Sequence, residues 1–329
     1  MDTPREFPEV WERSSTFVEK PILSALCFVY GAERFMRGLL DDLLAQTILP
    51  RMEIVIVDTG SPTDEASIVR EYIAKYPNIA YLRTPERETT TSAANRCIAA
   101  ARGKYVTLAC ADDRHRRDAL ERLVDVLERN PQHALAYADV AITDTENENA
   151  DMATVVGHLR WPDFDPVRLF QVCAVGPQPV YQRRLHEQYG GYDPNYVTAG
   201  DYEFWLRVVS QGETFVHVPE VLGVYLRSQS SNEHANQGLS IAESEKARIV
   251  HWPHAWGARP APDGCYLTLL PSPIRVSLNA EAPAPKQTPV SVAPVPAAAA
   301  APQQPAAATD PLDAMSALAA AATAARANA

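Results

Sequence analysis

The sequence predicts an α/β fold with a mostly parallel central sheet and helices on both faces. From Pro21 onward, apolar runs of strand length alternate with amphipathic stretches of helical period, which is the pattern of β-α-β units. Acids follow two of these runs, Asp58 after 53–57 and Asp112-Asp113 after 105–110. Because the carboxyl ends of parallel strands meet at one edge of a sheet, we expect these acids in one cleft.

Local signals define the elements of this first half. Strands are predicted at 22–29, 53–57, 79–83, 105–110 and 135–140. Helices are predicted at 33–46, from Ser61 to Tyr72, at 90–102 and after Asp118. Ser61-Pro62 is typical of an N-cap followed by proline at the first helical position. Gly103 is expected to close one helix and Asp118 to cap the next.

The alternation loosens beyond Asp151. Strand-like segments at 176–181 and 214–218, a Gly190-Gly191 turn and a helix at 202–209 are expected there. We interpret this region as a second half that completes the cleft and not as an independent domain.

Five parts are predicted along the chain. An N-terminal extension at 1–20 precedes the main domain at 21–250, which a C-terminal extension follows at 251–281. The Ala/Pro-rich stretch 282–309 has few charges or aromatic residues, so a disordered linker is expected. Residues 310–329 have high helix propensity and predict either a short terminal helix that docks on a protein partner or a frayed helix without a role.

Composition and charge limit the function classes. The chain has 329 residues, 46% of them hydrophobic, a net charge of −11 and a pI of about 5.2. An acidic chain argues against a nucleic-acid partner, which needs clustered Lys and Arg. The short basic run 114–117 is expected either to face an anionic ligand or to form a solvated helix start.

The cysteines and the hydropathy pattern predict a cytoplasmic protein without a membrane span. Five cysteines lie far apart without a C-x-x-C pair, which is typical of a reducing compartment. No stretch of about 18 apolar residues occurs, and the first 20 residues lack a signal-peptide pattern.

Carboxylates at the ends of two strands suit a metal-bound phosphate. Hard oxygen ligands hold Mg²⁺ or Mn²⁺, and the metal neutralises phosphate oxygens. An isolated Asp-Asp pair would be a turn before a helix, but the placement of these acids favours nucleotide chemistry.

Several motifs occur in a characteristic order. Residues 24–31 (S-A-L-C-F-V-Y-G) precede V-I-V-D-T-G-S at 55–61, A-N-R at 94–96, A-D-D at 111–113 and A-G-D-Y-E-F-W-L-R at 199–207. Over about residues 21 to 230, this set resembles the inverting nucleotide-sugar glycosyltransferases of family 2, which have the GT-A fold. Thr59 replaces the usual second acid of the V-V-V-D-D-G-S motif, and Cys110 stands where a D-A-D-D version has its first acid.

The resemblance implies roles for five residues. Asp58 would accept a hydrogen bond from the nucleotide base, favouring uracil or thymine. Asp112 would lie near the ribose and the metal, and Asp113 would be the principal ligand of Mg²⁺ or Mn²⁺ on the diphosphate. Asp201 would be the general base, and Tyr30 would lie near the donor.

The implied reaction moves a sugar with inversion from a UDP- or dTDP-sugar to an acceptor hydroxyl on a glycan, a lipid-linked saccharide or a protein. The metal neutralises the leaving diphosphate. A carboxylate takes the acceptor proton, which contributes about 10²–10⁴ in rate. Asp201 precedes a predicted helix, whose N-terminus favours the ionised form; alone, it would be a plain N-cap.

Other side chains have two interpretations each. Trp161 is expected either to stack on an acceptor sugar or to anchor its loop. His234, in the polar stretch 227–234 that resembles a lid, is expected either to complete the metal site or to be solvated. Phe204 and Trp205 are interpreted as core residues.

Two other classes of function remain open at this point. One is a catalytically silent GT-A domain that binds nucleotide or glycan, or assembles through its tail. The other is a sugar-1-phosphate nucleotidyltransferase. In that class a Gly-rich basic loop follows the first strand, and residues 30–34 do not have this composition.

Overall fold

In the computed structural model, residues 11–14, 20–228, 236–253, 256–257 and 267–276 are described. All of them lie within one unit that spans residues 1–281. His234, the predicted linker and the predicted terminal helix lie outside the described residues, as does most of the N-terminal extension.

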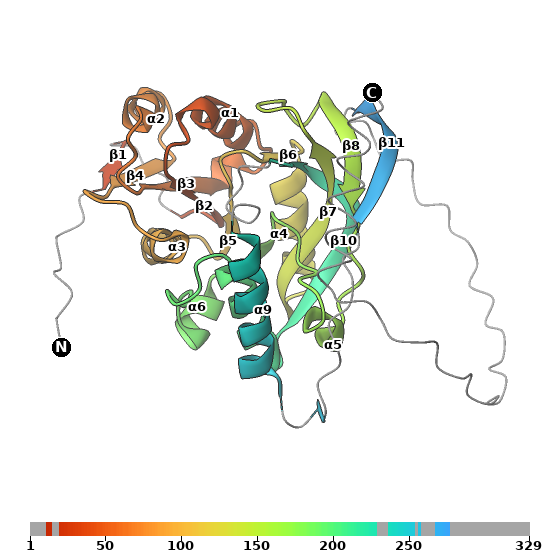
Figure 1. The fold of residues 1–329 in the computed structure, drawn as a ribbon. Helices are drawn as coiled ribbons and strands as arrows, with labels where there is room; N and C mark the ends of the chain where they lie inside the picture. The colour runs from red at the N-terminus through yellow and green to blue at the C-terminus, as the bar shows by residue number, and fades with distance from the viewer. Residues whose placement is uncertain (1–10, 15–19, 229–235, 254–255, 258–266, 277–329) are drawn as a thin grey trace, which may run out of the picture. The chain divides into compact units, whose positions relative to one another are not determined.

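A sheet of eleven strands runs through the described residues in the order β1-β4-β3-β2-β5-β9-β7-β10-β6, and β8 joins β7 to β11 (Figure 1). The strands are β1 (Glu12–Arg13), β2 (Leu23–Val29), β3 (Met52–Asp58), β4 (Ile79–Arg83), β5 (Tyr105–Leu108), β6 (Arg114–His115), β7 (His133–Thr143), β8 (Ala153–Leu159), β9 (Val180–Gln182), β10 (Thr214–Leu226) and β11 (Leu267–Val276).

Parallel pairing positions the predicted acids at one edge. Strands β4, β3, β2 and β5 are parallel neighbours, and β7 is parallel to β10. The short strand β9 is antiparallel to both β5 and β7 and joins the two parts into one sheet. The second half therefore completes the same sheet.

Helices cover both faces of this sheet, so the predicted α/β class is confirmed. The helices are α1 (Glu33–Leu44), α2 (Glu65–Ile73), α3 (Thr90–Ala100), α4 (Ala119–Arg129), α5 (Pro166–Leu169), α6 (Arg184–Tyr189), α7 (Gly200–Ser210) and α9 (Gln237–His251), with a 3₁₀ turn at Leu49–Arg51. Figure 1 shows α1 and α2 on one side of β2–β4 and α3 on the other. Apolar residues of α1, α2 and α4 form one buried cluster, and those of α3 and α7 form another.

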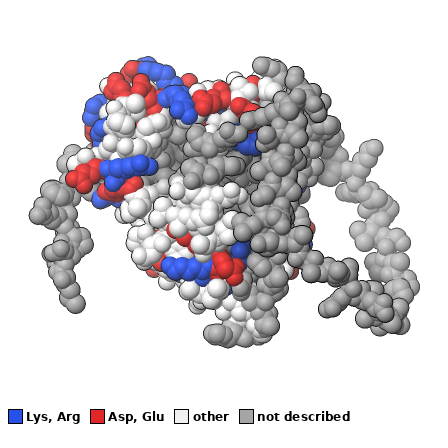
Figure 2. Space-filling view, viewed as in Figure 1, with Lys and Arg blue, Asp and Glu red and all other residues white. Residues whose placement is uncertain are grey.

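Charges of both signs lie together on the surface over α1 and α2 (Figure 2). Exposed ion pairs join Arg37 to Glu71 at 2.9 Å and Arg70 to Glu12 at 2.8 Å. Such paired charges do not form the single-sign surface that binds a phosphate backbone. In the described part of the chain, no helix is both long and apolar enough to cross a membrane.

The predicted start of α2 was wrong by three residues, since the N-cap is Asp64 and not Ser61. The backbone N–H of Ser61 donates to Asp58 Oδ1 at 2.8 Å, and its hydroxyl accepts from the N–H of Gly31 at 3.1 Å. These bonds hold Ser61 in the loop after β3, so the helix begins only at Glu65.

Two other predicted helix signals have different roles. Asp118 precedes α4 but makes no side-chain cap, because its carboxylate pairs with Arg116. The helix α3 ends at Ala100, and Gly103 does not have the left-handed backbone of a glycine cap. Residues 105–110 form a strand only to Leu108.

Gly103 is required where the chain enters β5. A Cβ at this position would lie 2.7 Å from the backbone N of Ser24 and 2.7 Å from the carbonyl O of Tyr105. The buried Glu53 carboxylate holds the same corner, since it accepts hydrogen bonds from the Ser24 hydroxyl at 2.6 Å and from the N–H of Arg102 at 2.7 Å. Backbone atoms cannot retreat from an added methyl as a flexible side chain can.

We therefore expect Gly103→Ala to lower the free energy of unfolding by about 1–3 kcal/mol. Gly238→Ala is the matched control, because nothing lies within 4 Å of its Cβ position in α9 and alanine is the better helix former. Urea unfolding of both variants measures the difference. Equal midpoints would show that the corner at Gly103 relaxes without cost.

Candidate active site

Asp112 and Asp113 lie in the turn after β5, where the sequence predicts them. Asp113 is 2% exposed, and its Oδ1 accepts a hydrogen bond from the N–H of Leu226 at 3.1 Å. Burial raises the pKa of both carboxyls, and the neighbouring Asp112 raises that of Asp113 further. Two adjacent acids are thus held where their negative charge is poorly compensated.

A buried arginine shapes this turn from below. Arg114 is 3% exposed and donates to the carbonyl oxygens of Ala111 at 2.9 Å and Asp113 at 2.6 Å, and to Asn147 Oδ1 at 2.8 Å. Burial lowers the pKa of its guanidinium. The basic run 114–117 is therefore not a solvated helix start, because Arg114 holds the turn and His115 is also buried.

Asp201 and the paired acids act on the same thiol. Burial and then the negative charges of Asp113, Asp112 and Asp201 raise the pKa of Cys110. Asp201 is exposed and is the second residue of α7, so it lies inside the first turn and not before the helix as predicted. Its Oδ1 accepts from the N–H of Tyr202 at 2.8 Å. The adjacent pair Asp112-Asp113 and the distant Asp201 therefore lie near enough to Cys110 for their charges to act on it.

Asp58 is the centre of a hydrogen-bond network at the end of β3. Its carboxylate accepts from the Ser61 N–H, from the hydroxyl of Tyr81 at 2.9 Å and from Arg83 at 2.7 Å, and it is fully buried. A nucleotide base can contact this carboxylate only if one of these donor groups moves away from it. The contact with a nucleotide base stays a prediction.

Tyr30 lies at the end of β2 and is 41% exposed. The guanidinium of Arg87 lies over its ring, 4.1 Å from the centroid. Gly31 follows with a φ of 62°, a conformation that glycine adopts without strain. Tyr30 therefore stands beside the same sheet edge, and its role toward a donor stays a prediction.

The paired acids fit a divalent cation that takes most of its ligands from elsewhere. Among the described residues, no group of three or more His, Cys, Asp or Glu is placed to hold a metal ion. Mg²⁺ sites in nucleotide enzymes use one or two carboxylates together with phosphate oxygens and water. Asp112 and Asp113 match this arrangement, since burial disfavours their unpaired charges.

Asn95, on α3, holds the turn at Gly191-Tyr192 against that helix. Its side chain exchanges two hydrogen bonds with the backbone of Tyr192, at 2.9 and 2.8 Å. A Cβ on Gly191 would lie 2.5 Å from Asn95 Oδ1. The sequence motif contained Asn95, but its partner lies 97 residues away, so no local pattern could identify this role.

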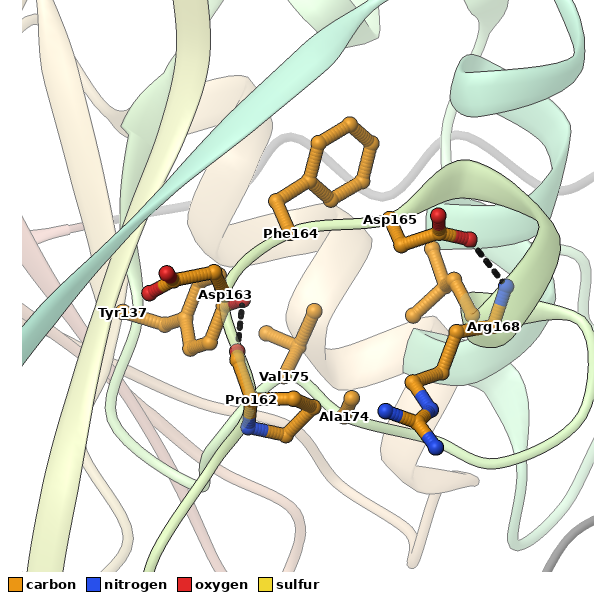
Figure 3. Close-up of a pocket in the computed structure, with 9 residues that line it drawn as sticks. Tyr137, Pro162, Asp163, Phe164, Asp165, Arg168, Ala174 and Val175 are labelled. Carbon is orange, nitrogen blue, oxygen red and sulfur yellow. Dashed lines mark hydrogen bonds between the residues drawn. The ribbon is translucent and has the colours of Figure 1, made fainter. Parts of the chain in front are cut away.

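The loop after β8 carries Trp161 and is anchored at several points. Tyr137 donates to the carbonyl of Pro162 at 2.7 Å, beside a small pocket that Asp163 and Phe164 also line (Figure 3). The Nε1 of Trp161 is buried without a partner, and its ring packs against the apolar core. These contacts favour the loop-anchoring interpretation of Trp161.

His217 joins this loop to the sheet. Its ring nitrogens lie 3.0 Å from Asp139 Oδ1 and 3.1 Å from Asp163 Oδ1. Burial opposes the charge on the ring, but the hydrogen bonds to the two carboxylates raise the pKa of His217 above its ordinary value. Arg160 also pairs with Asp139, at 2.9 Å.

Phe204 and Trp205 are core residues, as predicted. They are 0% and 1% exposed and pack among the aromatic rings beneath α7.

Comparisons with known proteins agree with this geometry. The model of the family described as Glycosyl transferase family 2 matches residues 24–173. An uncharacterized glycosyltransferase of Methanocaldococcus jannaschii is 22% identical over 209 residues, which cover 63% of this chain and 71% of that protein. Chondroitin synthase of Escherichia coli is 23% identical over 72% of this chain and 33% of its own length.

Solved structures show the same fold. TarS of S. aureus in complex with UDP matches with a TM-score of 0.55 and 15% identity, over 71% of this chain and 65% of that one. The mannosyltransferase PcManGT of Pyrobaculum calidifontis, in complex with GDP-Man and Mn²⁺, matches with a TM-score of 0.54 and 18% identity, over 78% and 70%.

These matches confirm the predicted resemblance to glycosyltransferase family 2 and the predicted GT-A fold, and they support glycosyltransferase as the enzyme class. The chain spans about a third of chondroitin synthase, so the activity of that whole protein is not transferred to it.

Because the pKa of His217 is raised, we expect the stability of the protein to depend on pH. The folded state binds this proton more tightly than the unfolded chain, so the stabilisation is complete below about pH 6.5. It is lost as the pH rises through the raised pKa. We expect the free energy of unfolding of wild type to fall, relative to His217→Gln, over that interval.

Urea unfolding at a series of pH values from 5 to 9 measures the difference between the two proteins. Other titrating groups contribute to both curves, so the difference isolates His217. Parallel curves would contradict the role given to the pairs with Asp139 and Asp163.

Proposed function

We propose that this protein is an inverting glycosyltransferase that moves a sugar from a UDP- or dTDP-sugar to an acceptor hydroxyl. The observation that carries the proposal is the position of Asp112 and Asp113 in the turn after β5, with Asp201 in the first turn of α7 near enough for its charge to raise the pKa of Cys110. Asp113 is buried and Asp112 partly buried, so that burial raises the pKa of both, and Asp201 is exposed. A leaving-group site and a proton acceptor therefore adjoin.

Each residue has one task in this proposal. Asp113 and Asp112 would hold Mn²⁺ or Mg²⁺, and Arg114 keeps their turn in place. A metal held there would supply positive charge for the leaving diphosphate. Asp201 accepts the proton of the acceptor hydroxyl as that oxygen attacks the sugar from the opposite face.

In this proposal the nucleotide base contacts Asp58, and Tyr30 lies beside the donor. Asp58 is the buried centre of the bonds to Tyr81 and Arg83, so a donor contact there involves a shift of the half-exposed Arg83. The UDP complex of TarS supports a uridine donor, whereas the GDP-Man complex of PcManGT is a reason to test guanosine donors too.

The acceptor is proposed to belong to a surface glycan, a lipid-linked saccharide or a protein glycan. Chondroitin synthase and an O-antigen biosynthesis protein are among the relatives and support a glycan product. The expected cytoplasmic location and the protein partner of the C-terminal tail belong to the same proposal.

The test is release of nucleoside diphosphate from UDP-, dTDP- and GDP-sugars, with Mn²⁺ or with EDTA, supplied with candidate acceptors. We expect one donor to give a metal-dependent signal. Asp201→Asn should lower that rate by about 10²–10⁴ while binding of the nucleotide with Mn²⁺ stays unchanged.

Asp125→Asn is the matched control, since it removes the same charge from an exposed pair with Arg129 on α4. If Asp201→Asn had the turnover rate of wild type, Asp201 would not be the general base. Nucleotide binding without turnover for any donor and acceptor would favour a silent GT-A domain.

A further inference from the structure

A buried carboxylate on α9 is not used in the scheme above. Glu243 is 7% exposed and lies on the helix that packs against α7. Its carboxylate faces the three residues that lead into α7, which carries Asp201.

Glu243 accepts four hydrogen bonds from those residues. Its Oε1 accepts from the N–H of Val197 at 2.8 Å, and its Oε2 accepts from the N–H of Thr198 at 2.9 Å and of Ala199 at 3.0 Å. The hydroxyl of Thr198 also donates to Oε2, at 2.9 Å. Ala199 is the N-cap residue of α7, immediately before Gly200. One side chain thus orders three consecutive peptide groups immediately before Gly200-Asp201.

The charge of Glu243 suits this task. Burial opposes ionisation, but the backbone N–H groups of Val197, Thr198 and Ala199 lower the pKa of Glu243 below its ordinary value. Charge-assisted hydrogen bonds are about twice as strong as neutral ones. The neutral amide of glutamine has the same shape but would bring its own N–H groups toward the backbone N–H groups. Part of the four hydrogen bonds would then be lost.

The opposite side of the same segment is also fixed. A Cβ on Gly200 would lie 2.4 Å from Thr91 Cγ2, so the first turn of α7 rests directly on α3. A second contact ties α9 to α7, because Glu203 lies 2.8 Å from His251 Nε2. Asp201 is therefore carried by a turn held between α3 and α9.

We propose that Glu243 is the positioning residue for Asp201. It holds the entry to α7 so that the Asp201 carboxylate faces the acceptor oxygen, and it does not touch substrate. This inference rests on the proposed function of Asp201 as general base. A shift of about 1 Å in a reacting group can cost about a hundredfold in rate, so loss of this clamp acts on turnover and not on donor binding.

The experiment compares four full-length variants with wild type: Glu243→Gln, Asp201→Asn, the double variant, and Glu71→Gln. Glu71 is the charge control, since it forms an exposed pair with Arg37 on α2. Thermal unfolding establishes that each variant is folded.

Turnover of the donor found in the screen is the first measurement. We expect Glu243→Gln to lower kcat by about tenfold to a hundredfold, with the donor KM unchanged and Glu71→Gln equal to wild type. In the Asp201→Asn background, Glu243→Gln should cause no further loss, because its effect passes through Asp201.

Hydrogen exchange by mass spectrometry is the second measurement and needs no turnover. Amides of 197–199 should exchange about tenfold faster in Glu243→Gln, while amides of β3 keep their wild-type rates. Wild type that releases no nucleoside diphosphate would refute the proposed function, whereas the exchange result still tests the clamp.

Two results overturn the inference. Unchanged exchange at 197–199 would show that Glu243 does not hold the segment. Equal losses from Glu243→Gln in the wild-type and Asp201→Asn backgrounds would show that it acts independently of Asp201.

Discussion

A buried carboxylate needs hydrogen-bond donors around it, and this requirement determines how several segments of the fold are arranged. Glu53 holds the corner between β2 and β5, Asp58 holds the loop after β3, and Glu243 holds the entry to α7. Each of these acids is less than 10% exposed and accepts three or more hydrogen bonds, at least two of them from segments distant in sequence. Burying a charge without partners costs roughly several kcal/mol. The segments around each acid are therefore held where their N–H and O–H groups reach its carboxylate.

Asp112 and Asp113 depart from this rule. Arg114 lies beneath them but donates to backbone carbonyls and to Asn147, not to their carboxylates. Apart from the Leu226 N–H that donates to Asp113, few donors offset their burial, so burial raises their pKa, whereas hydrogen bonds lower the pKa of Glu243. The same type of residue is thus a structural clamp where donors surround it, and under the proposed function it would be a binding group where donors are few.

Local patterns were sufficient to predict the first half of the sheet. Continuous apolar runs marked β2 to β5, and their order placed Asp58 and Asp112-Asp113 at one edge. The strand β8 and the helix α9 had no such signal, because each buries only part of one face. Ser61 and Asp118 have the composition of helix caps, but contacts with Asp58 and Arg116 determine where they lie.

The roles of Glu243 and Arg114 could not be predicted from spacing. Glu243 contacts residues 44 to 46 positions away, and Arg114 belongs to a basic run that composition alone assigns to the surface. Both roles arise from tertiary contacts between segments that the one-dimensional pattern does not relate.

The bond from the Leu226 N–H to Asp113 spans 113 residues and has a consequence for biosynthesis. The parallel pairs β2–β3 and β3–β4 join strands that follow one another in the chain and can form early, whereas contacts between distant segments are slow to close. During synthesis the chain emerges from its N-terminal end. The Leu226 bond therefore secures Asp113, the proposed metal ligand, only after β10 has been made, later than the pairing of β2, β3 and β4 can form.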